Sequence, residues 1–99
     1  MRIKIYNIMN KTELLDGLSY TRRSKNRTNL VLYLSYTVKM PSEIANHMNL
    51  RINQVSAILK DLKKENIVVC LNEQEKKGRL YKLTPKGKEI HEMIVKNID

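Results

Sequence analysis

Residues 41–62 read PSEIANHMNLRINQVSAILKDL, and their pattern is the strongest indication of the fold. Proline suits the first turn of a helix, because no backbone N–H is needed there. Apolar residues recur at one-turn spacing in both halves. They are Ile44, Ala45 and Met48, then Leu50 at the turn, then Ile52, Val55, Leu59 and Leu62. The pattern predicts two short helices joined by a tight turn, a helix-turn-helix, whose second helix lies in the DNA major groove.

The other face of the second helix, about 52–65, carries side chains suited to DNA. With Val55 toward the core, Asn53 and Ala57 point away from it. Asn53 and Gln54 can each pair bidentately with adenine, and Ala57 is small enough to meet a thymine methyl. The alternative is an ordinary solvated helix face. We predict base contacts by Asn53, Gln54, Ser56 and Ala57, and phosphate contacts by Ser42, Arg51, Lys60, Lys63 and Lys64.

The charge balance favours a polyanion as partner. The 99 residues include 19 Lys and Arg against 10 Asp and Glu, a formal net charge of +9. Such an excess favours nucleic acid through counterion release. The basic residues do not line one face of a long amphipathic helix, so a membrane surface is the poorer candidate.

Composition and residue spacing also exclude several classes of protein. No segment is apolar over a length that spans a bilayer, and residues 1–9 mix charged and apolar residues unlike a signal peptide, so we expect a cytoplasmic protein. Cys70, the only cysteine, is expected to be a small buried residue. His47 and His91 lie far from it in sequence, so we expect neither metal nor cofactor. The sequence contains no nucleophile motif and no paired catalytic carboxylates, so we do not expect an enzyme.

The N-terminal part predicts two helices. Residues 1–9 fit either a short edge strand or a frayed arm. Asn10 and Glu13 have capping-box spacing, which predicts a helix over about 11 to 20. Ser24 is a plausible N-cap for a helix over about 25 to 37. Its buried stripe would be Leu30, Val31 and Leu34, closed by Tyr33 or Val38.

The segment between these helices is strongly basic. It contains Arg22, Arg23, Lys25 and Arg27 around Ser24. Helix N-termini and arginine side chains both favour anions, so we predict that these five residues clamp phosphates. The alternative is a solvated helix entry.

The C-terminal part predicts a hairpin and a last helix. Residues 67–71 and 79–83 read as strands, with a polar tip over about 72–79. Lys76, Lys77 and Arg79 could lie along the DNA backbone or enter a minor groove, although two glutamates in the tip oppose this. Thr84 and Pro85 then start a helix over about 85 to 97.

Three helices followed by a hairpin form the winged-helix arrangement, and several segments resemble known members. Residues 50–62 resemble the turn and recognition helix of many prokaryotic winged-helix regulators. Residues 78–87, GRLYKLTPKG, are similar to their wing exit, where a Tyr-x-Leu-Thr-x-x-Gly run leads into the last helix. Residues 20–27 resemble the entry segment of small archaeal members of the MarR/ArsR-like group, and residues 24–87 resemble those members as a whole. Arg51 departs from them, because a Ser or Thr cap is common there.

The resemblance implies one winged helix-turn-helix domain over residues 1–99, mainly α with a small β-hairpin. Residues 1–20 would form an N-terminal extension and helix, 24–83 the winged-helix core, and 84–99 the C-terminal helix. The first and last helices hold more apolar residues than such a core requires, which predicts a homodimer. The alternative is a monomer. The interface would contain Leu14, Leu15, Leu18, Ile90, Met93, Ile94 and Ile98.

The favoured function is a transcription regulator that binds double-stranded DNA with sequence specificity. Two alternatives stay open: a winged-helix module for protein interaction, and a non-specific chromosomal or RNA-binding protein. An effector would have to bind between helices or at the dimer interface. The sequence does not identify one.

Overall fold

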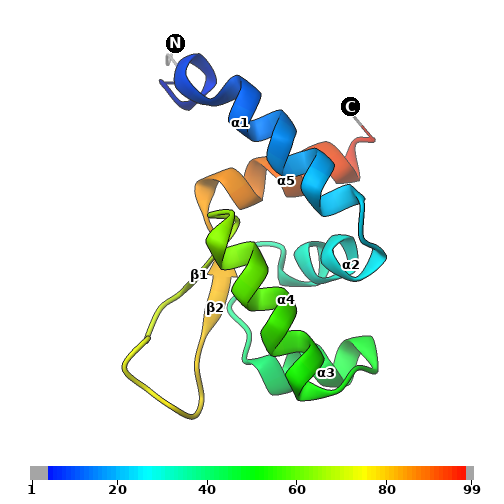
Figure 1. Cartoon of the computed structure of the whole chain (residues 1–99), viewed down its shortest axis with the longest axis vertical. Helices are drawn as coiled ribbons and strands as arrows, with labels where there is room; N and C mark the ends of the chain where they lie inside the picture. Colours follow the sequence, from blue (N-terminus) through cyan, green and yellow to red (C-terminus); the bar gives the residue numbers. More distant parts are fainter. Residues whose placement is uncertain (1–4, 98–99) are drawn as a thin grey trace.

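The computed structural model describes residues 5–97, and side chains from residue 11 onward (Figure 1). It is mainly α with a small antiparallel hairpin and helices added at both ends, which confirms the predicted winged-helix fold. The elements, in chain order, are α1 (Ile5–Arg22), α2 (Lys25–Leu34), α3 (Pro41–Met48), α4 (Ile52–Lys64), β1 (Val68–Cys70), β2 (Tyr81–Leu83) and α5 (Pro85–Val95).

Backbone hydrogen bonds connect the hairpin to the segment before the helix-turn-helix. β1 pairs antiparallel with β2, with Val68 opposite Leu83 and Cys70 opposite Tyr81. On its other side, β2 forms a bridge with Lys39, two residues before the first residue of α3. The two backbone N–H···O distances between Lys39 and Tyr81 are 3.0 and 2.9 Å. The base of the wing is therefore fixed to the segment that begins α3.

The core lies between α2, α3, α4 and the sheet. The predicted stripe of α4 is confirmed for Val55, Leu59 and Leu62, which are buried. It is wrong for Ile52, which is 50% exposed because it lies at the first turn of α4 and lines a surface groove instead of the core. The other fully buried side chains include Leu30, Val31, Leu34, Ile44, Ile67, Val68, Leu83 and Ile90.

The N-terminal helix begins earlier than predicted. α1 starts at Ile5, so residues 5–9 are neither a strand nor an arm, and residues 1–4 lie outside the described residues. Asn10 stands inside the helix, so its predicted capping role is wrong. Ile5, Ile8 and Met9 also fit helical spacing, and this pattern outweighs the short alternation that suggested a strand.

The ends of two further helices also differ from prediction. α2 ends at Leu34 rather than 37, because Thr37 donates from both its N–H and its hydroxyl to the Leu34 carbonyl, at 2.8 and 2.7 Å. Val38 is exposed and does not close the stripe, whereas Tyr33 packs partly against the core. α5 ends at Val95 rather than 97.

α1 crosses α5 at a glycine (Figure 1). A Cβ at Gly17 would lie 2.9 Å from Ile90 Cδ1, so the two helices approach closely there. Leu18 and Ile90 are buried in the core of their own chain. Their predicted place in a dimer interface is therefore wrong, because this packing uses them within one chain.

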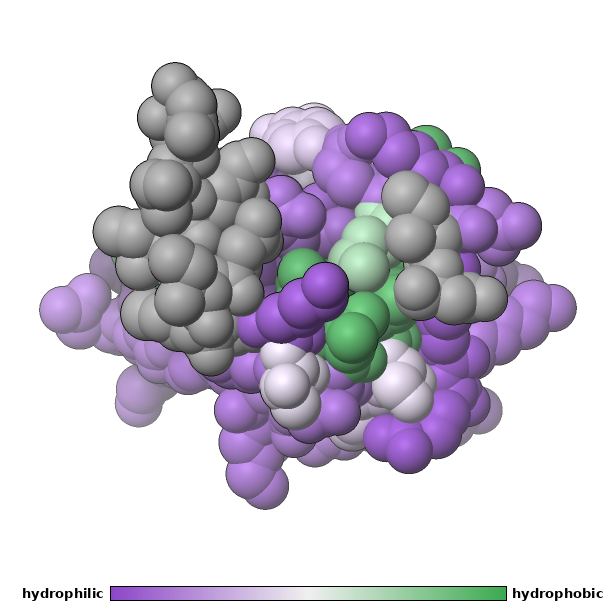
Figure 2. Space-filling view, turned by 90° about the horizontal axis from the view of Figure 1, so that it is seen from above, coloured by the Kyte–Doolittle hydropathy of each residue, from purple (hydrophilic) through white to green (hydrophobic). Residues whose placement is uncertain are grey.

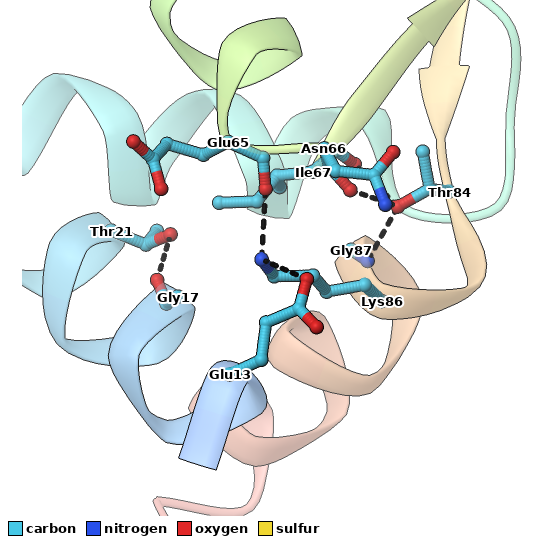
Figure 3. A network of polar contacts seen from close by, with 9 residues as sticks. All are labelled: Glu13, Gly17, Thr21, Glu65, Asn66, Ile67, Thr84, Lys86 and Gly87. Atoms are coloured by element: carbon cyan, nitrogen blue, oxygen red, sulfur yellow. Dashed lines mark hydrogen bonds and ion pairs between the residues drawn. The ribbon is translucent and has the colours of Figure 1, made fainter. Parts of the chain in front are cut away.

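A polar network connects the start of α5 to the rest of the fold (Figure 3). The Thr84 hydroxyl accepts from the Gly87 N–H at 3.0 Å and donates to the Asn66 carbonyl at 2.7 Å. Lys86 Nζ donates to the Glu65 carbonyl at 2.8 Å and pairs with the Glu13 carboxylate at 3.2 Å. The Thr-x-x-Gly part of the wing exit thus caps α5 and ties it to the end of α4 and to α1.

Candidate nucleic-acid interface

A groove of about 670 Å³ runs between α4, the hairpin loop and the start of α3. We call it the wing groove. Five of its lining residues are Lys or Arg, and none is acidic. A groove lined in this way suits a polyanion. The lining residues are Met40, Pro41 and Ser42, then Ile52, Ser56, Lys60 and Lys63 of α4, then Lys76, Lys77, Gly78, Arg79 and Tyr81.

α4 presents two adjacent stripes outside the core. Ile52, Ser56, Lys60 and Lys63 follow at helical spacing and line the wing groove. Asn53, Ala57 and Lys64 form the next stripe, opposite the buried Val55, and all three are exposed. The predicted base-contacting residues are thus on the surface, beside the cationic groove.

Gln54 is engaged at the start of its own helix. Its side-chain Oε1 accepts from the Arg51 N–H at 3.0 Å. This bond is one half of a capping box. The other half, in which a Ser or Thr hydroxyl accepts from an N–H of the first turn, is missing because the Arg51 side chain has no acceptor. Bidentate pairing with adenine would require the same amide oxygen, so capping and base contact compete at Gln54.

The loop of the wing, residues 71–80, is closed by two of its own side chains. Arg79 Nε donates to the Glu75 carbonyl at 2.6 Å, and a terminal guanidinium nitrogen donates to the Glu73 carbonyl at 3.1 Å. Asn72 donates to the Gly78 carbonyl at 3.1 Å and accepts from the Leu80 N–H at 2.8 Å. Arg79 therefore braces the loop, and Lys76 and Lys77 are its exposed cations.

An ion pair between Lys63 and Glu73 ties α4 to the wing. The hydrogen bond between them raises the pKa of Lys63 and lowers the pKa of Glu73, so both groups are charged near neutral pH. Lys63 was predicted to contact phosphate. In the structure it forms an ion pair with Glu73. Among residues 11–97, Lys60 is the α4 cation of the groove that has no ion pair.

The predicted phosphate clamp lies elsewhere, since none of its five residues lines the wing groove. The Arg27 guanidinium stacks on the Tyr20 ring at 3.7 Å and donates to the Tyr20 carbonyl at 2.7 Å. It thus closes the end of α1, a role that the charge pattern did not reveal. The Ser24 hydroxyl accepts from the Arg27 N–H at 3.2 Å, so Ser24 is the N-cap of α2, as predicted. Arg22, Arg23 and Lys25 are exposed, and their contacts with phosphate stay a prediction.

The remaining candidate residues show no catalytic grouping. Within residues 5–97, no three His, Cys, Asp or Glu side chains gather where a metal could be held. Cys70 is buried, as expected. His47 stacks on Tyr33 with ring centroids 3.9 Å apart, and His91 is buried against Tyr36. No helix in the described part of the chain has the length and apolarity to cross a membrane.

The fold matches two solved structures of HlyU from Vibrio cholerae N16961. The first has a TM-score of 0.72 at 15% identity and covers 89% of this chain and 95% of that chain. The second, of reduced HlyU, has a TM-score of 0.73 at 15% identity and covers 93% and 96%. No protein-family model matches the chain, and no curated protein matches its sequence. At this identity the likeness shows the fold alone.

Proposed function

We propose that the protein is a transcription regulator that binds double-stranded DNA with sequence specificity. The observation that carries this proposal is the wing groove, in which five cations and no acids adjoin the exposed polar stripe of α4. A protein-interaction module would not need this combination. The winged-helix fold supports the proposal, because helix-turn-helix units place their second helix in the major groove.

In this proposal each part of the surface has a separate task. Asn53 and Ala57 contact base edges from the outward stripe of α4, with Ser56 and Gln54 on either side. Residues around these base contacts bind phosphates, and the phosphate contacts fix the register of the protein on the duplex. The proposed phosphate contacts are Lys60, Lys63 and Lys64 of α4, Ser42 and Arg51 at the starts of α3 and α4, and Arg22, Arg23 and Lys25. Lys76 and Lys77 of the wing lie along the backbone or in a minor groove.

Changing Asn53 to alanine tests base contact. A preferred site is first enriched from a random duplex library with the wild-type protein. We expect the variant to lose about 1–3 kcal/mol on that site and little on random duplex, because a bidentate base contact is lost. Fluorescence anisotropy at one salt concentration measures both. Asn29→Ala, an exposed asparagine of α2 outside the groove, is the matched control. Equal losses on both duplexes would contradict base contact and indicate a backbone contact.

The same assay separates the competing functions. Preference for one duplex over random duplex and single-stranded RNA supports the proposal. Similar affinity for all three would instead indicate a non-specific chromosomal or RNA-binding protein. Absence of binding to any of them would indicate a protein-interaction module.

We also propose that the protein is a two-fold dimer through the face made by α1 and α5. Seen from that end, the molecule shows an apolar patch that polar residues border in part (Figure 2). With Leu18 and Ile90 in the core and Ile98 outside the described residues, the proposed contacts are Leu14, Leu15, Met93 and Ile94. Leu15 is exposed, and the other three pack only partly against the core. Such a dimer would place two recognition helices about 34–36 Å apart, matched to a palindromic site.

Changing Ile94 to glutamate is expected to dissociate this dimer. A charge left in a desolvated apolar interface is costly, so the dimer dissociation constant should rise roughly 100-fold. Sedimentation equilibrium at micromolar concentration measures it, with circular dichroism to confirm that helicity is retained. The control is Val38→Glu, an exposed apolar residue outside α1 and α5. A monomeric wild-type protein would contradict the dimer.

A further inference from the structure

One apolar residue is exposed where the proposed DNA contact is cationic. Among side chains of residues 11–97, the exposed large apolar residues are Leu15, Tyr36, Val38, Ile52, Leu71 and Val95. Of these, Ile52 is the one that lines the wing groove. The sequence pattern assigned it to the core, so the structure changes what this residue can do.

The surroundings of Ile52 form an apolar end of the groove. Met40 and Pro41 line the groove with it, and Ser56 follows one turn later on α4. The lysines and the arginine lie further along α4 and on the wing. A ligand that fits this groove therefore offers negative charge along most of its length and an apolar group at one end.

Thymine in a duplex fits this description. Its C5-methyl is the apolar group that bases display in the major groove, and phosphates lie on both sides of that groove. Ile52 is the first residue of α4, and residues near the start of a recognition helix are those that reach base edges. We propose that Ile52 selects thymine through contact between its side chain and the C5-methyl. This inference rests on the proposed function and adds the base that the site selects.

The test removes only the methyl group. In the site enriched by the wild-type protein, each thymine is replaced in turn by deoxyuridine, which keeps every hydrogen-bonding group. At one or more positions we expect the affinity of the wild-type protein to fall roughly three- to fivefold, as for one buried methyl group.

Variants then assign the methyl contact to Ile52. In Ile52→Ala the thymine and uracil duplexes should bind equally well at that position, whereas Ile52→Val should retain part of the difference. Val95→Ala, an exposed apolar residue outside the groove, should retain all of it. Ile52 is half exposed at a helix end, so the fold should tolerate these changes, and thermal unfolding checks this.

The outcomes separate this inference from the proposed function. An enriched site that binds equally well with uracil at every position would overturn the inference and leave specific DNA binding intact. A methyl effect that persists in Ile52→Ala would assign the contact to another residue, such as Ala57, and would also overturn it. Failure to enrich any site would overturn both.

Discussion

Changing Gly87 to alanine is expected to lower the free energy of unfolding by about 2–3 kcal/mol, the upper part of the range of about 1–3 kcal/mol for overpacked interiors. An added Cβ would lie 2.2 Å from the carbonyl oxygen of Ile67 and 3.1 Å from Leu83 Cβ. The Ile67 carbonyl also accepts from the Thr84 N–H at 3.0 Å, so moving it disturbs the junction between α4, the hairpin and α5. The added Cβ meets backbone, which cannot turn aside, so the overpacking outweighs the roughly 1 kcal/mol of helix propensity that alanine gains over glycine.

Urea unfolding followed by circular dichroism measures this loss, and Gly17→Ala is the matched control. A Cβ at Gly17 would meet Ile90 Cδ1 and Lys86 Cε, each at 2.9 Å. These atoms are the ends of side chains that can turn aside, and alanine favours a helix, so we expect a change within about 1 kcal/mol. If Gly87→Ala proved as stable as Gly17→Ala, the close backbone approach at Gly87 would be contradicted.

The fold could be predicted from sequence because its main signals are local. Val55, Leu59 and Leu62 follow one helical stripe, and Thr84 with Pro85 marks a helix start. Ile52 continues the same spacing but is half exposed. Periodicity identifies the face of a helix on which a residue lies. It does not show where along the helix a neighbouring element ends.

The site could be predicted less well because polar side chains have several possible partners. The positive charge of Arg27 indicated phosphate, yet its guanidinium holds Tyr20, seven residues earlier. Arg79 braces its own loop in the same way. Lys63 meets Glu73 only because the hairpin begins beside the end of α4. A list of charges identifies the candidate surface, whereas the fold decides which charges are available to a ligand.

The dimer prediction shows the same limit for apolar residues. Leu15 and Leu18 both belong to the apolar set of α1, but Leu18 is buried in the core and Leu15 is exposed. The sequence showed more apolar surface than a three-helix core requires. It did not show that α1 crosses α5 at Gly17 and covers part of that surface within one chain.

Changing Lys60 to glutamate is expected to weaken binding to every duplex by roughly 30- to 100-fold. Lys60 lines the wing groove and also borders the outward stripe of α4, so it stands between the two proposed contacts. Loss of one charge-assisted contact costs about 1.5–3 kcal/mol, and the new carboxylate would repel the same phosphate. The slope of log affinity against log salt should also fall by about one unit.

A control variant with the same change in net charge shows whether the position of Lys60 or net charge alone is responsible for the loss of affinity. Lys11→Glu lowers the net charge by the same two units at an exposed residue of α1. This helix lies at the other end of the molecule from the wing (Figure 1). We expect it to weaken binding by less than about threefold at physiological salt, because charges beyond about 8 Å are largely screened. Equal losses for the two variants would mean that net charge alone attracts DNA and that the wing groove is not the contact. A large loss confined to Lys60→Glu, with thermal unfolding unchanged, would assign the contact to the groove, because screening lets only nearby charges act.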